Sequence, residues 1–127
     1  MIKKILIGIV FLVLIAIGVM DIVFVDKSVN FAIERTNELE KLIDSGAEGE
    51  KLKETANELE QNWIKSEKML TVFMYYRDVD TLGKQINLVK MLIEENSLED
   101  AKVEIGGLKY LLSSAKKISE FSFDNIF

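Results

Sequence analysis

The sequence predicts an all-α protein in which an N-terminal transmembrane helix is followed by a four-helix antiparallel bundle of two helical hairpins. The 127 residues contain no proline, and beyond the first 25 residues apolar side chains recur every three or four positions. Proline in a helix interior costs about 3 kcal/mol, and a three/four spacing gathers apolar side chains on one helix face. About a hundred residues follow the N-terminal stretch, enough for one core.

The first element is an apolar stretch with the length of a membrane span. Residues 5–20 contain no charged side chain, and apolar residues continue to Val25 with one aspartate among them. At 1.5 Å per residue, a helix over residues 5–25 is about 31 Å long, close to the roughly 30 Å of bilayer hydrocarbon. The sequence therefore predicts that residues 1–25 form a transmembrane anchor.

The charges around the anchor predict its orientation in the cell membrane. Lys3 and Lys4 precede the apolar stretch, and lysine favours the cytoplasmic side of a span. We expect a single pass with a cytoplasmic N-terminus, and an extracytoplasmic helical domain over residues 26–127. Two alternatives are a buried core helix and a cleaved signal peptide, for which Ala16 and Gly18 form a weak cleavage site.

Two amphipathic helices are predicted to form the first hairpin. Gly46 is expected to stop the first helix, and Ser45 with Glu48 fits a capping box for the second, which extends within residues 47–76. We interpret the lone tryptophan of the second helix as a core anchor. The predicted core positions are Val29, Ala32, Thr36, Leu39 and Ile43 in the first helix, and Leu52, Ala56, Leu59, Trp63, Leu70 and Phe73 in the second.

Two further helices are predicted to form the second hairpin. Asp78 or Asp80 is expected to cap the first of them, and Ser97 with Asp100 fits the capping pattern of the last. The predicted core positions are Val79, Leu82, Ile86, Val89 and Ile93, then Leu98, Ala101, Ile105, Leu108, Leu112 and Ala115. Short connections between four amphipathic helices favour an antiparallel bundle.

The two hairpins share a loose sequence pattern. The segments LEKLIDSG and LVKMLIEENS each join a helix end rich in Leu and Ile to an acidic turn. We interpret the likeness as a common way of building a helical hairpin, because repeat architectures normally need at least three copies.

Two glycines interrupt the last helix. Gly106 and Gly107 each cost about 1 kcal/mol relative to alanine. We predict that they allow the close approach of a bulky side chain such as Trp63, and a kink is the alternative.

The end of the second hairpin helix is unusually apolar. The segment MLTVFMYYR ends in Tyr75, Tyr76 and Arg77, and these residue types favour a membrane interface. A return helix of up to about 44 Å, against about 28 Å for the outgoing one, would bring them back to the bilayer. A kinked helix end buried in the core is the alternative, and an all-round apolar composition favours it.

The C-terminal segment FSFDNIF is also apolar. We expect Phe121, Phe123, Ile126 and Phe127 to cover the open, membrane-proximal end of the core as a structural lock. The alternative is a docking peptide for a partner.

The composition removes several classes of chemistry. The chain has no cysteine and no histidine, which excludes disulfides, thiolate sites and the commonest general base. Acidic pairs such as Glu34 with Glu38 lack the spacing of a calcium loop and indicate solvated faces. Residues 26–127 carry 14 Lys and Arg against 20 Asp and Glu, so the domain is expected to avoid nucleic acid and anionic lipid surfaces.

Nearly the whole chain resembles a known family. Its Lys-flanked span, ELEQNWIKSEKML around the tryptophan, INLVKMLIEEN, LEDAKVEIGGLKYLL and the final FSFDNIF are similar to the domain of unknown function (DUF) 4363 family of small bacterial membrane proteins. The resemblance implies a single-pass protein of unknown activity and brings no catalytic residues with it.

These observations predict a membrane-anchored helical interaction or structural module on the outer face of a bacterial membrane. We expect no catalytic residues, metal or cofactor, and partners limited to the membrane and an unidentified protein. The alternative is an enzyme or small-ligand receptor that uses carboxylates and tyrosines in an interhelical pocket.

Overall fold

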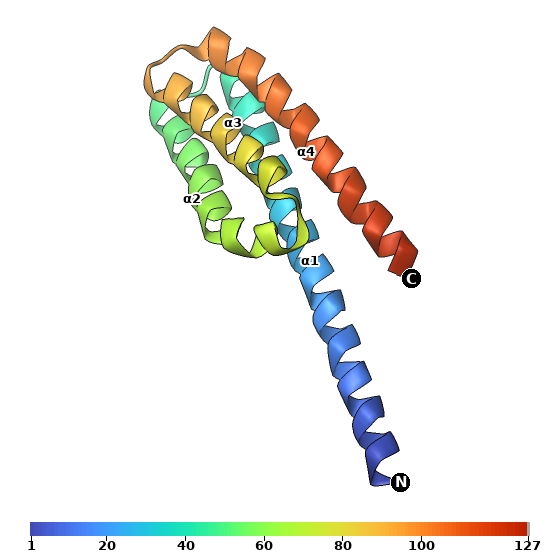
Figure 1. Ribbon diagram of the computed structural model, residues 1–127. Coiled ribbons are helices and arrows are strands. Elements are labelled where there is room, and N and C mark those ends of the chain that lie inside the picture. Colours follow the sequence, from blue (N-terminus) through green and yellow to red (C-terminus); the bar gives the residue numbers. More distant parts are fainter. Residues whose placement is uncertain (127) are drawn as a thin grey trace.

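The structure, a computed structural model, describes residues 1–126, and within them all side chains except those of residues 21, 22 and 119–126. It contains four helices, α1 (Ile2–Asp44), α2 (Gly49–Phe73), α3 (Tyr76–Glu94) and α4 (Leu98–Ile126), and no strand in the described part. α1 and α3 each pack against both α2 and α4, which gives a four-sided antiparallel bundle (Figure 1). The predicted all-α bundle is confirmed.

The anchor segment and the first bundle helix are one continuous helix. The sequence suggested two successive elements, but residues 21–28 contain no glycine or proline that would break α1. The described side chains from residue 1 to residue 18 are exposed, and burial begins at Val25. The length and apolar composition of α1 are those of a helix that can cross a membrane, and a signal sequence has the same properties.

The core occupies the part of the bundle beyond Val25 and follows the predicted helix faces. Thr36 is fully buried and satisfies its hydroxyl by donating to the backbone carbonyl of Ala32 at 2.7 Å. Such internal satisfaction allows a polar side chain to lie among apolar ones. The buried apolar side chains are Val25, Val29, Ala32, Leu39, Leu52, Ala56, Leu59, Trp63, Leu70, Val79, Leu82, Ile86, Val89, Ile93, Ala101, Ile105, Leu108, Leu112 and Ala115.

Helices α1 and α3 end as the residue types at their C-termini require. After α1, Gly46 has a φ of +70°, and the amide of Ala47 donates to the carbonyl of Leu42 at 3.0 Å. After α3, Asn96 has a φ of +59°, and the amide of Ser97 donates to the carbonyl of Leu92 at 2.8 Å. Both ends are therefore Schellman motifs with a left-handed residue, which is the physical basis of the shared sequence pattern.

The equivalence of the hairpins extends into the core. Core positions of α3 lie fifty residues after those of α1, as Val79 does after Val29, and core positions of α4 lie forty-nine after those of α2, as Ala101 does after Leu52. The register of buried side chains is therefore repeated, although the residue types are not. A common register in both hairpins allows their core side chains to meet in the same layers along the bundle axis.

The left-handed residues of the two turns provide a test of this assignment. Gly46→Ala should destabilise the bundle by about 1 kcal/mol, because the Cβ atom is strained at positive φ, and lower the thermal midpoint by about 4 to 8 °C. Asn96→Gly is the matched control and should leave the midpoint unchanged or raise it, since glycine tolerates this conformation. Circular dichroism melting measures both, and an unaltered midpoint for Gly46→Ala would contradict the assignment.

Helix ends differ from the sequence-based expectations in two places. Ser45 is the C-cap of α1 and donates to the carbonyl of Leu42 at 3.1 Å, whereas α2 begins after Glu48 without a side-chain cap. α3 begins after Tyr75, likewise without a side-chain cap from an aspartate. The predicted caps at Ser45 and at Asp78 or Asp80 are therefore wrong, because the chain turns earlier than the aspartates suggested.

The glycine that accommodates Trp63 is also not the predicted one. A Cβ atom at Gly83 of α3 would lie 3.3 Å from Nε1 of Trp63, tighter than ordinary contact. At Gly106 a Cβ atom would meet nothing within 4 Å, and at Gly107 its nearest neighbour would be Gln85. Trp63 thus packs against α3, the neighbour of α2, because α4 lies diagonally across the bundle.

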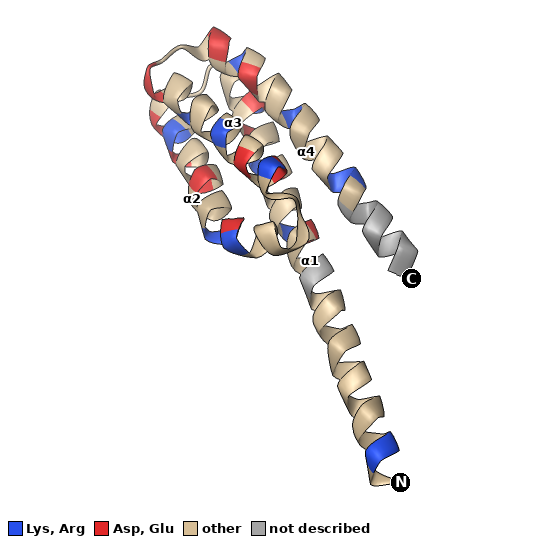
Figure 2. Cartoon of the chain, viewed as in Figure 1, with Lys and Arg blue, Asp and Glu red and all other residues tan. Residues whose placement is uncertain are grey.

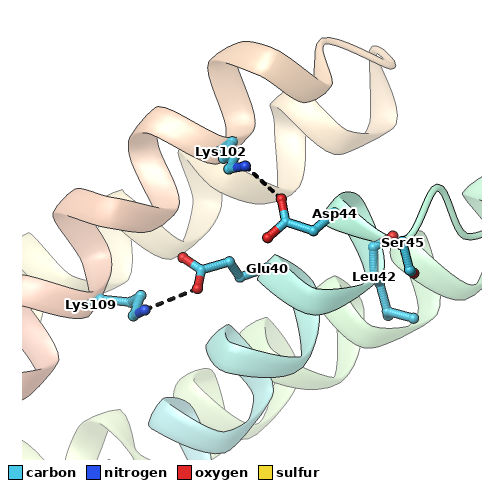
Figure 3. Close-up of polar contacts among 6 residues, drawn as sticks. All are labelled: Glu40, Leu42, Asp44, Ser45, Lys102 and Lys109. Atoms are coloured by element: carbon cyan, nitrogen blue, oxygen red, sulfur yellow. Dashed lines mark hydrogen bonds and ion pairs between the residues drawn. The ribbon is translucent and has the colours of Figure 1, made fainter.

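Polar contacts join neighbouring helices at the surface of the bundle, around the core. Lys109 of α4 donates to Glu40 of α1 at 3.1 Å, and Lys102 donates to Asp44 (Figure 3). This hydrogen bond and the charge of Asp44 raise the pKa of Lys102 above its usual value. Between α2 and α3, Lys90 pairs with Glu60 at 2.9 Å. The pairs made by Lys102 and Lys109 are partly to largely exposed, and such pairs add at most about 1 kcal/mol each.

Candidate functional site

The end of the bundle from which α1 emerges is the candidate functional surface. The α2–α3 turn lies beside α1 at this end, and the other two turns lie at the opposite end (Figure 1). Within the core, the buried hydroxyl of Ser28 in α1 donates to that of Ser66 in α2 over 3.4 Å. This contact sets the axial register between the two helices at the end in question.

The register places the end of α2 close to the apolar part of α1. Phe73, the last residue of α2, lies seven residues beyond Ser66, and Met20 lies eight residues before Ser28. At 1.5 Å per residue these separations are about 10 and 12 Å in the same direction. The end of α2 is therefore nearly level with the end of the uninterrupted apolar stretch of α1.

Large apolar side chains are exposed at this level. We name them the apolar corner: Met69, Val72 and Phe73 of α2, Tyr75 of the turn, Tyr76 of α3 and Ile118 of α4. Tyr75 is 82% exposed, Val72 70% and Tyr76 69%, and Arg77 is exposed beside them. The sequence-based alternative of a buried helix end is therefore wrong for the two tyrosines.

The exposure has a local cause. Met74 and Tyr75 are extended, with ψ angles of 157° and 134°, so the chain leaves the α2 axis directly after Phe73. Phe73, which the periodicity had placed in the core, is 42% exposed because no further turn of α2 packs over it. A periodic pattern identifies the face of a helix but not its last turn, and boundaries are accordingly the weaker part of such predictions.

The apolar corner surrounds a shallow hollow. A cavity of about 360 Å³ opens between the α2–α3 turn and α4, with a smaller one of about 110 Å³ beside it between α3 and α4. The larger one is lined by Val72, Phe73, Met74, Tyr75, Asp78 and Ile118. Asp78 supplies its one charged side chain, so the hollow is mainly apolar.

Among the side chains that the structure describes, charge is divided between the two ends of the bundle. In residues 23–33, 62–84 and 110–118, at the end of the apolar corner, there are seven Lys and Arg against four Asp and Glu. In residues 34–61 and 85–109 there are seven against fourteen, and acidic residues gather around the two distal turns (Figure 2). The average charge of the domain, from which we expected it to avoid anionic lipid surfaces, therefore does not describe the charge at each end.

The other candidate residues are placed as follows. Trp63 is 2% exposed in the core, with a buried Nε1 that has no hydrogen-bond partner among the described residues. The prediction for Phe121, Phe123, Ile126 and Phe127 concerns side chains outside those that the structure describes. Within the described part, no three Asp or Glu residues are arranged to hold a metal ion, and the buried polar side chains are Ser28, Thr36, Thr55 and Ser66.

Comparison with known proteins identifies the family. Neither the curated proteins nor the solved structures give a match to this chain. The family model of a domain of unknown function, DUF4363, matches residues 20–126, which comprise the whole helical bundle and the last part of the apolar stretch. The chain therefore belongs to the DUF4363 family.

Proposed function

We propose that this protein is a membrane-anchored helical interaction or structural module on the outer face of a bacterial membrane, with no catalysis of its own. The observation that carries the proposal is the continuity of α1. Its exposed apolar part passes directly into a helix whose next turns are buried in the bundle core. An exposed apolar helix of this length is stable in a bilayer and unfavourable in water.

The distribution of charge supports a role in partner binding for the distal end of the bundle, which carries the α1–α2 and α3–α4 turns. The segment of α1 from Val25 to Asp44 is about 28 Å long, so the acidic turns stand clear of the bilayer. Acidic side chains there favour a partner with basic or polar contact groups and steer its approach. The distal end is thus the surface we assign to the unidentified protein partner.

The orientation is tested with single cysteines, because the natural chain has none. Ser113, exposed on α4, should react after Ser113→Cys with a membrane-impermeant thiol reagent in intact cells. The matched variant Lys4→Cys, at the predicted cytoplasmic end, should react only after lysis. Labelling of Ser113→Cys only after lysis would overturn the proposed topology.

A further inference from the structure

We infer that the apolar corner is a second membrane contact, which lies in the lipid interface beside α1. The inference depends on the proposed membrane anchoring and adds to it a surface of the bundle itself. The occupant of the surface is the headgroup and upper acyl region of the same bilayer that α1 crosses. The apolar corner and the two cavities around it are then covered by lipid.

The chemistry of the corner fits a lipid interface. Tyr75 and Tyr76 are adjacent and both largely exposed, and tyrosine is enriched at bilayer interfaces because its ring is apolar and its hydroxyl is polar. Val72 and Met69 are exposed about one and two turns earlier on α2. A contiguous exposed patch of this kind marks a protein or membrane contact in soluble domains.

The position of the corner brings it to the bilayer. The Ser28–Ser66 contact makes the end of α2 nearly level with Met20, where the uninterrupted apolar stretch of α1 ends. No linker separates the two parts of α1, so the bundle cannot move away from the surface without bending a helix. Any bilayer that holds residues 5–20 therefore meets the α2–α3 turn.

Basic side chains near the corner are suited to the headgroups. Lys65 and Lys68 are exposed in the last turns of α2, and Arg77 is exposed in the first turn of α3. Long basic side chains can extend along an apolar surface and place their charges at the level of lipid phosphates. Among the side chains that the structure describes at this end, basic residues outnumber acidic ones, which suits an anionic bilayer surface.

Depth-dependent quenching in vesicles tests the contact with the full-length chain. The variant Tyr76→Cys is labelled at the new thiol with an environment-sensitive fluorophore. The labelled protein is then placed in vesicles of phosphatidylcholine and phosphatidylglycerol. Val103→Cys is the matched control, because Val103 is 72% exposed and follows Lys102, which contacts Asp44. Asp44 lies nineteen residues beyond Val25, about 28 Å farther from the corner along α1.

We expect the probe at Tyr76→Cys to be quenched several-fold more strongly than the control by lipids spin-labelled at the headgroup or upper acyl chain. Aqueous iodide should quench the probe at Tyr76→Cys several-fold less than it quenches the control probe. Equal quenching of both probes by iodide, in protein that floats with the vesicles, overturns the second contact and leaves the anchoring intact. Protection from iodide without quenching by the labelled lipids also overturns it, because protein then covers the corner. Failure of both variants to float with the vesicles contradicts the proposed anchoring itself.

Discussion

Trp63→Ala should lower the free energy of unfolding by about 3 to 5 kcal/mol, the usual cost of removing a large aromatic side chain from a core. Trp63 is 2% exposed and lies between α2 and α3 in the middle of the buried set. The bundle cannot fill the lost volume without moving two helices that are fixed by other core contacts. Chemical unfolding followed by circular dichroism measures the change, since the variant has no tryptophan fluorescence.

The neighbouring residue provides the control for this prediction. Ile64 is 52% exposed, so Ile64→Ala should cost well under half as much as Trp63→Ala.

Gly83→Ala should be nearly neutral, because a gain of about 1 kcal/mol in helix propensity opposes the crowding of the indole ring. Gly83→Leu should destabilise by about 1 to 3 kcal/mol through overpacking. A stable Gly83→Leu variant would contradict the close packing of Trp63 on α3.

Val10→Lys combined with Leu14→Lys should release the protein from the membrane. Both residues are exposed near the middle of the apolar stretch and lie one helical turn apart. Each lysine at the centre of a span costs about 2.5 to 3.5 kcal/mol, so the pair costs about 5 to 7 kcal/mol, roughly a 10⁴-fold change in partition. The measurement is the fraction of protein that stays with the membrane pellet after an alkaline wash.

A second pair of substitutions controls for added charge. Val103→Lys with Tyr110→Lys introduces the same charges at exposed apolar positions of α4 and should leave the protein in the pellet with the natural chain. Retention of the Val10 and Leu14 variant in the pellet would show that α1 is not the anchor. Recovery of the natural chain as a soluble form beginning near Val19 would instead identify a cleaved signal peptide.

The core was predictable from the sequence because burial follows the helical period. Positions such as Leu39, Ile86 and Leu108 were identified from spacing alone, and each is buried. The Gly46 turn was predictable for a similar reason, since glycine at a helix end has few other roles. These features depend on residues close together in sequence, where the local rules apply directly.

Contacts between distant residues were not predictable in the same way. Lys102 contacts Asp44 of α1, fifty-eight residues away, although Glu99 lies three residues before it in the same helix. The site for Trp63 at Gly83 depends on which helices are neighbours, which a single sequence does not state. The exposure of Tyr75 and Tyr76 depends on the place where α2 ends, and residues 74–76 contain no glycine or proline to mark it.

The unbroken α1 helix also fixes an angle. In the anchoring we propose, and with 3.6 residues per turn, the number of residues between the apolar stretch of α1 and Val25 sets the direction in which the bundle faces around the membrane normal. Inserting one residue there would turn the whole bundle by about 100° relative to the lipid-facing side of the anchor. In the same proposed arrangement, a rotation of the anchor about its axis would turn the acidic turns at the far end through the same angle, so α1 would transmit torque.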